Sequence, residues 1–454
     1  MLGPFQKRLK RFRPNPPQVL AFGFMIMIAV GSVLLSLPVS SANGVGLPYI
    51  DALFMATSAT CVTGLSFFNI GGHFSTFGQL VLLLLVQIGG LGFMTVATLA
   101  ALVFRRRISF RERLILQEAM NQSNTEGIVR LIRKVLLYAL IIEAIGALVL
   151  AVRWMFEMPW GQALYFGLFH SISIFNNAGF DLFGMFPERA SSLMHYVDDP
   201  IVNAVTMGLI VLGGIGFIVI SDLLQYRQHK KLTLHSKVVL TVSGGLIVIG
   251  TLVIFLFELT NPQTLQPLSP IGKVFSSMFQ SVTARSAGLS TLDTADLRQA
   301  TQFFILLLMF IGAAPGSSGG GIKVTTFAIL IGAMVAMVRG KEDIVLFRHR
   351  IAKDRIYKAI TFTLLSFFLI VLAAMILSTT EEFPFLGILF EVTSAYGTAG
   401  MSMGLTAQLT TFGKIVIILM MFIGRLGPVT LAFTLTPKTE KELFRYPEGK
   451  ITIG

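Results

Sequence analysis

The segment FMATSATCVTG, residues 54–64, leads from large apolar side chains through small and hydroxyl residues to a glycine. Segments of the same design recur three times, as FHSISIFNNAG, MFQSVTARSAG and FEVTSAYGTAG, at residues 169–179, 278–288 and 390–400. Their final glycines are spaced by 115, 109 and 112 residues, and a phenylalanine or methionine stands ten positions before each of them. A unit of this length therefore repeats along the whole chain.

The composition is that of an integral membrane protein. Of the 454 residues, 54% are hydrophobic and only 13% are charged, and the mean hydropathy is +0.76. Apolar runs near 20 residues recur, which is the length that crosses a hydrocarbon core about 30 Å thick. A single cysteine, Cys61, excludes a disulfide framework, and the six scattered histidines lack the spacing of a zinc site.

Each unit is interpreted as a spanning helix, a short apolar segment, a glycine-bearing loop and a second spanning helix. The short segment cannot cross the membrane, so it is predicted to be a re-entrant half-helix. The predicted fold is an all-α membrane protein of about eight spanning helices, with four parallel helix/pore-loop/helix repeats around one central pore. We expect the first helices at 19–38, 132–155, 235–258 and 356–378, the half-helices at 49–59, 161–174, 269–283 and 384–395, and the second helices at 77–104, 200–224, 300–338 with a central break, and 411–436.

Basic residues gather in segments that alternate with loops nearly free of Lys and Arg, which is the positive-inside pattern. It predicts a multi-pass protein of the cell membrane with both termini cytoplasmic, and it argues against nucleic acid as the partner of the net charge of +13. A secretory signal at the start is the alternative, but the later basic loops keep their phase only if residues 19–38 stay as a helix. The predicted units are a basic tail at 1–18, repeats at 19–104, 105–224, 225–338 and 339–436, and a second tail at 437–454.

Four non-helical loops at membrane depth must share one protein-lined, hydrated cavity, because an unmade backbone hydrogen bond in hydrocarbon costs several kcal/mol. A ring of loop carbonyls would replace the hydration shell of a cation, and the C-terminal ends of four half-helices would add negative potential. The predicted selectivity filter is made of Cys61, Val62, Thr63, Gly64, Asn176, Asn177, Ala178, Gly179, Arg285, Ser286, Ala287, Gly288, Gly397, Thr398, Ala399 and Gly400.

A second glycine motif follows each filter in the next apolar run. It reads GGLG, GGIG, GAAPG and GRLG, starting at residues 89, 213, 312 and 424. For Gly90, Gly214 and Gly427, close helix packing and a functional role both stay open. In the third repeat, small residues and a proline break the helix, because no continuous helix favours them. This intramembrane loop, residues 312–321, comprises Gly312, Ala313, Ala314, Pro315, Gly316, Ser317, Ser318, Gly319, Gly320 and Gly321.

With the four glycines, the segments APGSSGGGIK at 314–323 and GRLGP at 424–428 resemble the Trk/Ktr/HKT superfamily of potassium transporters, and within it the Ktr-type (KtrB) membrane subunits. The resemblance implies a potassium uptake system in which the intramembrane loop is a movable gate. It also implies a homodimer and a cytosolic nucleotide-binding regulatory ring of the KtrA type, with no nucleotide bound on this chain. Arg285 and the paired Asn176 and Asn177 depart from a uniform signature, so fourfold symmetry is expected to be approximate.

Arg425 lies in an apolar helix, where a lone charge is costly unless it faces protein or water. We predict that it faces the pore as a fixed positive charge restricting cations, with Lys323 as a second gate residue; an ion pair of Arg425 with Glu143 or Glu391 is the structural alternative. Glu143 by itself is interpreted as a bundle residue satisfied by a neighbour rather than a proton relay.

Two other function classes were weighed against a potassium pore. A membrane enzyme would need a convergent catalytic set, which the apolar spans do not offer, so this chain is expected not to be an enzyme. A secondary transporter of inverted repeats would need units of opposite orientation, whereas all four units begin from a basic side. The sequence leaves open whether sodium is also required.

Overall fold

A long helix opens each repeat of the computed structural model, which describes residues 16–92, 95, 114–115, 128–186 and 192–427. These four helices are long and apolar enough to cross a membrane, and their ends lie within four residues of the predicted ones. The predicted basic tails lie wholly or mostly outside the described residues. The long helices are α2 (Pro16–Ser36), α8 (Ile128–Trp154), α12 (Leu234–Glu258) and α16 (Lys353–Ser378).

A shorter helix follows each long one and packs against it. Proline marks the start of every short helix, either just before the first turn or at its first position, where the missing N–H costs no hydrogen bond. Each short helix ends three to five residues before a repeated glycine, as predicted. The four are α3 (Tyr49–Thr60), α9 (Trp160–Phe175), α13 (Pro270–Thr283) and α17 (Phe385–Gly397).

The second helix of every repeat stops at a glycine in the left-handed region of φ. The φ angles are 87° at Gly92, 88° at Gly216, 66° at Gly312 and 85° at Gly427. Only glycine adopts such angles at little cost, so each motif ends a helix. The helices concerned are α5 (Thr76–Leu91), α10 (Pro200–Gly214) with α11 (Phe217–His229), α14 (Gln299–Ile311) with α15 (Val324–Val338), and α18 (Thr411–Leu426).

The prediction of a continuous second helix at 200–224 is therefore wrong, because α10 and α11 meet at an angle of 101°. The predicted break in the third repeat is confirmed, since α14 and α15 are separate helices. Within the described residues only the four long helices, or five spans if α10 and α11 count as one, meet the length and hydropathy of a crossing helix. The second helices predicted at 77–104 and 411–436 also end earlier than predicted, at Leu91 and Leu426, and the stretches 93–104 and 428–436 lie largely outside the described residues.

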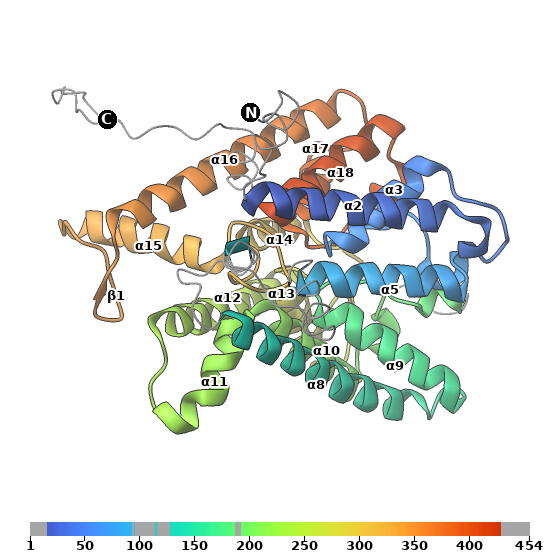
Figure 1. Cartoon of the computed structure of the whole chain (residues 1–454), viewed down its shortest axis with the longest axis horizontal. Coiled ribbons are helices and arrows are strands. Elements are labelled where there is room, and N and C mark those ends of the chain that lie inside the picture. The colour runs from blue at the N-terminus through green and yellow to red at the C-terminus, as the bar shows by residue number, and fades with distance from the viewer. Residues whose placement is uncertain (1–15, 93–94, 96–113, 116–127, 187–191, 428–454) are drawn as a thin grey trace, which may run out of the picture.

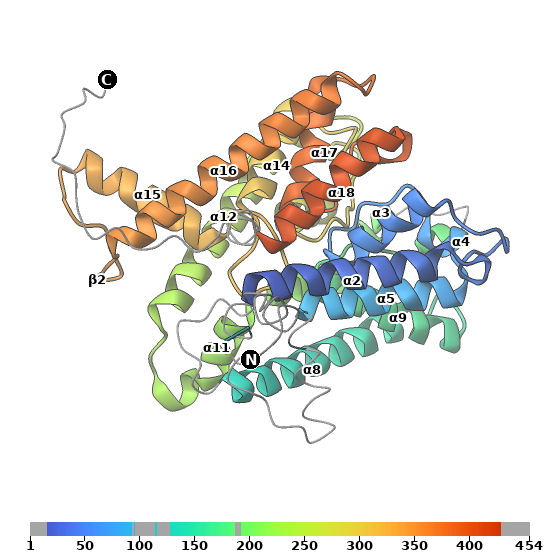
Figure 2. The ribbon, with the colours of Figure 1, turned by 45° about the horizontal axis from the view of Figure 1, so that its top comes forward.

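The repeats close into a ring. The second helix of each repeat packs on the short helix of the next one: α5 on α9, α10 on α13, α14 on α17, and α18 back on α3. Figures 1 and 2 show the first repeat, in blue, between the red helices of the fourth repeat and the green helices of the second. The chain is an all-α protein of four helix/pore-loop/helix repeats, as predicted.

The remaining elements lie at the two ends of the bundle. A two-stranded antiparallel hairpin, β1 (Val345–Leu346) and β2 (His349–Arg350), lies near α15 and far from α4 (Ile70–His73) in both ribbon views. Two of the basic segments, 225–237 and 339–358, belong to the end that holds the hairpin. Short 3-10 turns occur at Pro38–Ser40, Phe183–Met185, Met194–Tyr196 and Thr406–Gln408.

Several motif glycines allow a second helix to touch the end of the short helix in its own repeat. A Cβ atom on Gly89 would lie 2.0 Å from the Thr60 carbonyl oxygen, and one on Gly213 would lie 1.9 Å from that of Phe175. A Cβ on Gly424 would lie 1.9 Å from the carbonyl oxygen of Tyr396. These distances are far below van der Waals contact, so close packing explains the glycine at these positions.

We predict that Gly213→Ala lowers the thermal stability of the protein in detergent. The new methyl group would force α10 away from Phe175, and overpacking of this kind costs about 1–3 kcal/mol. Gly208→Ala on the same helix is the matched control, because nothing lies within 4 Å of a Cβ atom there. The midpoint of thermal unfolding should fall only for Gly213→Ala, and equal midpoints for the two variants would contradict the packing argument.

Candidate functional site

The four repeated glycines, called the ring glycines, lie next to one another in the order of the repeats. A Cβ atom on Gly64 would lie 2.1 Å from the carbonyl oxygen of Ala178, the residue just before Gly179. The same relation links Gly179 to Ala287 at 2.0 Å and Gly288 to Ala399 at 2.9 Å. The circle closes where a Cβ on Gly400 would lie 2.2 Å from the carbonyl oxygen of Thr63.

The backbone of the ring requires glycine for a second reason. The φ angles of the ring glycines are 91°, 69°, 75° and 78° in chain order, which L side chains rarely adopt. Side chains are excluded both by this conformation and by the neighbouring loop. The loops can therefore approach one another closely, which gathers backbone carbonyl groups of all four repeats in one place.

The short helices give this place its electrostatic character. All four end at the loops, so the C-terminal ends of α3, α9, α13 and α17 converge on the ring. Each helix end carries the equivalent of roughly half a negative charge. Carbonyl oxygens combined with negative helix ends favour a cation over an anion.

The third loop departs from the others, as its different sequence predicts. In the other three repeats the residue two before the ring glycine has a left-handed φ, and the next N–H donates to the carbonyl of a serine: Thr63 to Ser58, Ala178 to Ser173 and Ala399 to Ser394. In the third repeat Val282 replaces the serine, and the Ala287 N–H donates to the Thr283 carbonyl instead, at 3.0 Å. Fourfold symmetry is thus approximate.

A buried polar cluster supports the second loop from behind. The Asn176 side-chain amide donates to Gln87 at 2.8 Å and to Glu143 at 3.0 Å. Gln87 in turn donates to the other carboxylate oxygen of Glu143, also at 3.0 Å. Glu143 is therefore satisfied by neighbours within the bundle, and it ties α5 and α8 to the loop.

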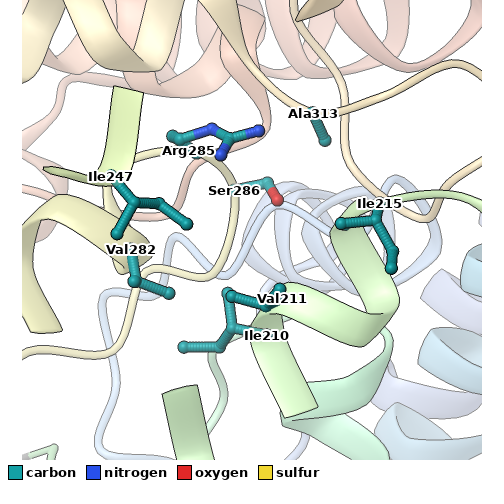
Figure 3. A pocket seen from close by; sticks show the side chains of 9 residues that line it. Ile210, Val211, Ile215, Ile247, Val282, Arg285, Ser286 and Ala313 are labelled. Atoms are coloured by element: carbon teal, nitrogen blue, oxygen red, sulfur yellow. The ribbon is translucent and has the colours of Figure 1, made fainter. Parts of the chain in front are cut away.

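Arg285 lies behind the third loop rather than in the ring. Its guanidinium donates to the carbonyl and hydroxyl of Ser243 at 3.2 and 3.0 Å, and at 3.5 Å to the carbonyl of Gly312, where the intramembrane loop begins. Figure 3 shows the Arg285 side chain close to Ala313, beside a cavity of about 20 Å³ lined also by Ser286. That volume holds about one water molecule.

The intramembrane loop, residues 312–321, docks into the bend between α10 and α11. The N–H of Ala314 donates to the carbonyl of Gly214 at 2.9 Å, and the N–H of Phe217 donates to the carbonyl of Gly316 at 3.1 Å. Breaking the helix at Gly216 frees these backbone groups from intrahelical bonds. The bend between α10 and α11, which the sequence did not predict, therefore forms the binding site for the intramembrane loop, which the sequence did predict.

Arg425 connects this loop to the first repeat. Its guanidinium donates to the carbonyl of Ser318 in the loop and to those of Gly89 and Gly90 at the end of α5, the last at 3.3 Å. Three backbone carbonyls from two repeats would lose a shared cation if this side chain were absent. The side chain therefore lies where α5, α18 and the loop meet.

No ion pair joins Arg425 to the two carboxylates considered as partners. Glu143 faces Gln87 and Asn176, and Glu391 accepts hydrogen bonds from Ser402, at 2.8 Å, and from Thr406. Among the residues that the structure describes, carbonyl groups hold the guanidinium, and no carboxylate forms an ion pair with it. Lys323 closes the loop in a similar way, because its ammonium donates to the Gly319 carbonyl and, at 3.4 Å, to that of Gly320.

Sequence reasoning missed the side chains that connect the loops to their surroundings. Gln87 and Ser243 lie on the apolar helices α5 and α12; Gln87 contacts Asn176 of the next repeat, and Ser243 contacts Arg285 42 residues away in its own repeat. No spacing rule within one repeat finds such pairs. A usable signal was that buried polar residues in apolar helices require a partner.

Known proteins have a similar architecture, and others have a related sequence. The structure resembles the crystal structure of the potassium transporter TrkH from Vibrio parahaemolyticus with a TM-score of 0.71, covering 92% of this chain and 84% of that chain at 20% sequence identity. Ktr system potassium uptake protein B of Bacillus subtilis is 45% identical over 99% of both chains. The potassium/sodium uptake protein NtpJ of Enterococcus hirae is 40% identical, again over 99% of both.

The fold and the ring together define a membrane protein of the pore-loop class with a site that favours cations. Residues 23–443 match the TrkH family of cation transport proteins. The chain belongs to this family.

Proposed function

We propose that this chain is the membrane-embedded, ion-translocating subunit of a potassium uptake system. The observation that carries the proposal is the closed ring in which each ring glycine touches the backbone carbonyl of the next repeat. Such a ring can replace the hydration shell of potassium. Relatives that match nearly the whole chain are named potassium uptake proteins, and one is named a potassium/sodium uptake protein, which supports the choice of ion.

The selectivity filter in this proposal consists of the four loops listed from the sequence, with carbonyls facing the axis. Potassium sheds water at the ring, where carbonyl dipoles and four helix ends stabilise it. Below the filter, the intramembrane loop and Arg425 restrict passage. A fixed, uncompensated guanidinium raises the energy of a cation beside it, so the loop must move or Arg425 must swing aside for flux.

The surroundings of the pore complete the proposal. The protein resides in the cell membrane with both termini cytoplasmic, as the basic segments indicate. In this proposal the chain works as a homodimer, and a cytosolic ring of nucleotide-binding subunits regulates uptake, as the resemblance to Ktr-type subunits implies. The name of one relative as part of a Ktr system supports a partner subunit. Sodium acts as a second ion or as a requirement for potassium uptake, in keeping with the relative named for both.

Radioactive rubidium uptake into proteoliposomes that contain the purified chain tests this function. We expect uptake that excess potassium blocks, because both ions compete for the same carbonyl ring. The measurement is made with and without sodium, and with and without a Ktr-type cytosolic subunit. Absence of potassium-sensitive uptake under all four conditions would contradict the proposal, and enzymatic turnover without flux would favour a membrane enzyme.

The ring assignment predicts that Gly288→Ser changes the selectivity between potassium and sodium. Serine restricts φ at this position and places a side chain near the Ala399 carbonyl, so the ring carbonyls must reorient. Gly404→Ser is the matched control, because Gly404 also has a left-handed φ, 90°, but has nothing within 4 Å of a Cβ atom. The ratio of rubidium to sodium uptake should change only in the Gly288 variant; an unchanged ratio there would count against the filter.

The barrier assignment predicts that Arg425→Gln raises cation flux severalfold, whereas Arg425→Lys largely retains the restriction. Gln removes the charge but keeps a polar side chain, and Lys keeps the charge with different hydrogen-bonding geometry. Uptake is normalised to the amount of protein inserted in the membrane. If the Gln variant inserts normally and conducts no more than the parent protein, charge is not the barrier.

A further inference from the structure

One position in each loop links the ring to the intramembrane loop. It is the position two residues before the ring glycine, and its side chain is almost fully buried in every repeat. Three of the four residues are polar, and all three contact the intramembrane loop or one another. The four residues are Val62, Asn177, Ser286 and Thr398.

In the fourth repeat the link is a direct hydrogen bond. The N–H of Gly320 in the intramembrane loop donates to the hydroxyl of Thr398 at 2.8 Å. Thr398 is completely buried and has a φ of 47°, a conformation that costs a β-branched residue free energy. The bond therefore helps to hold a strained filter residue in place.

In the second and third repeats the link is a chain of side chains. With the amide of Asn177 in its better-satisfied orientation, its oxygen accepts from the Ser318 hydroxyl at 2.9 Å and from the Ser286 hydroxyl at 3.2 Å. A Cβ atom on Gly319 would also lie 2.6 Å from the Ser286 hydroxyl oxygen, so the intramembrane loop is in direct contact with the third filter loop. The Asn177 side-chain amide thus connects Ser318 of the intramembrane loop to the second and third filter loops.

The first repeat differs, because Val62 offers no hydrogen bond at this position. On that side the loop is joined to the first repeat by Arg425, through the carbonyls of Ser318 and Gly89. The loop therefore contacts filter residues of the second, third and fourth repeats, and Arg425 links it to the end of α5 in the first repeat. It cannot move as an independent lid.

We propose that Thr398 and Asn177 are specificity-determining residues through which the intramembrane loop acts on the filter, so that displacing the loop loosens the filter and lowers its preference for potassium. This inference rests on the proposed function of the ring as a filter. When the loop moves, Thr398 and Asn177 lose partners in a buried site, and their strained backbones are released. Carbonyls one residue away then lose the geometry that selects among cations.

A merely mechanical role makes a different prediction. If these bonds only hold the loop shut, breaking one of them increases flux of all cations equally and leaves the selectivity ratio unchanged. Coupling requires flux and selectivity to change together. Measuring rubidium and sodium uptake on the same proteoliposomes distinguishes coupling from a purely mechanical role.

Thr398→Val tests the coupling, because it keeps the shape of the side chain and removes the hydroxyl. We expect rubidium uptake to rise and the rubidium-to-sodium ratio to fall by about fivefold, the effect of one typical net hydrogen bond. Thr398→Ser restores the hydroxyl and should restore both values. Thr393→Val is the matched control on α17, because the buried Thr393 hydroxyl has no hydrogen-bond partner among the described residues.

Ser318→Ala removes the second link without altering a filter residue, and it replaces Thr398→Val if that variant does not insert. Increased flux at an unchanged ratio, or no change in either value, overturns the coupling. Gly288→Ser is measured alongside as a direct change to the ring. If that variant also leaves the ratio unchanged, the filter itself is wrongly assigned; if it changes the ratio while Thr398→Val and Ser318→Ala do not, only the coupling fails.

Discussion

Close contact between the ring glycines and the carbonyls of neighbouring loops is the constraint on which the rest of this structure depends. Four stretches of non-helical backbone must be buried by protein or hydrated, because lipid offers no hydrogen bonds. Arranging them in a closed circle satisfies that requirement only if no side chain stands between one loop and the next. The spacing of the repeats, the re-entrant helices and the packing of each second helix on the next repeat all serve this circle.

The glycine motifs of the second helices follow from the same constraint. The breaks at Gly216 and Gly312 leave backbone groups free, and those groups accept or donate hydrogen bonds that hold the intramembrane loop, while the carbonyls of Gly89 and Gly90 accept from Arg425. Positive charge below the ring is held by carbonyls and not by carboxylates, as the contacts of Arg425 show. In the proposed function, an ion pair at this level would neutralise the charge, whereas carbonyl ligands hold the guanidinium in position and leave its field available to act on a cation.

Much of this arrangement could be predicted from the sequence, because it is encoded in residues of one repeat at a time. Apolar length placed the long helices, and the short apolar segment that recurs before each ring glycine placed the short ones. The ring glycines were found because the pattern recurs four times. The bend at Gly216 was missed because the segment is apolar on both sides, so hydropathy reads it as one helix.

Contacts between repeats could not be predicted in this way. Gln87 supports the loop of the next repeat and Ser243 a distant loop of its own repeat, and nothing in their local sequence identifies Asn176 or Arg285 as the partner. For Arg425 the sequence offered two carboxylates as partners, but a guanidinium with five donors is also satisfied by converging carbonyls at helix ends. Whether Arg425 contacts carboxylates or carbonyls depends on where α5 ends in the assembled ring of repeats.

The most direct test of the account is to locate a bound cation. Crystals of the protein grown in potassium and exchanged into rubidium should show anomalous scattering on the axis of the ring, between the carbonyl groups that precede Gly64, Gly179, Gly288 and Gly400. Returning the crystals to potassium should remove the signal. Rubidium bound reproducibly at another place, with the ring empty, would contradict the claim that these four loops form the ion-binding filter.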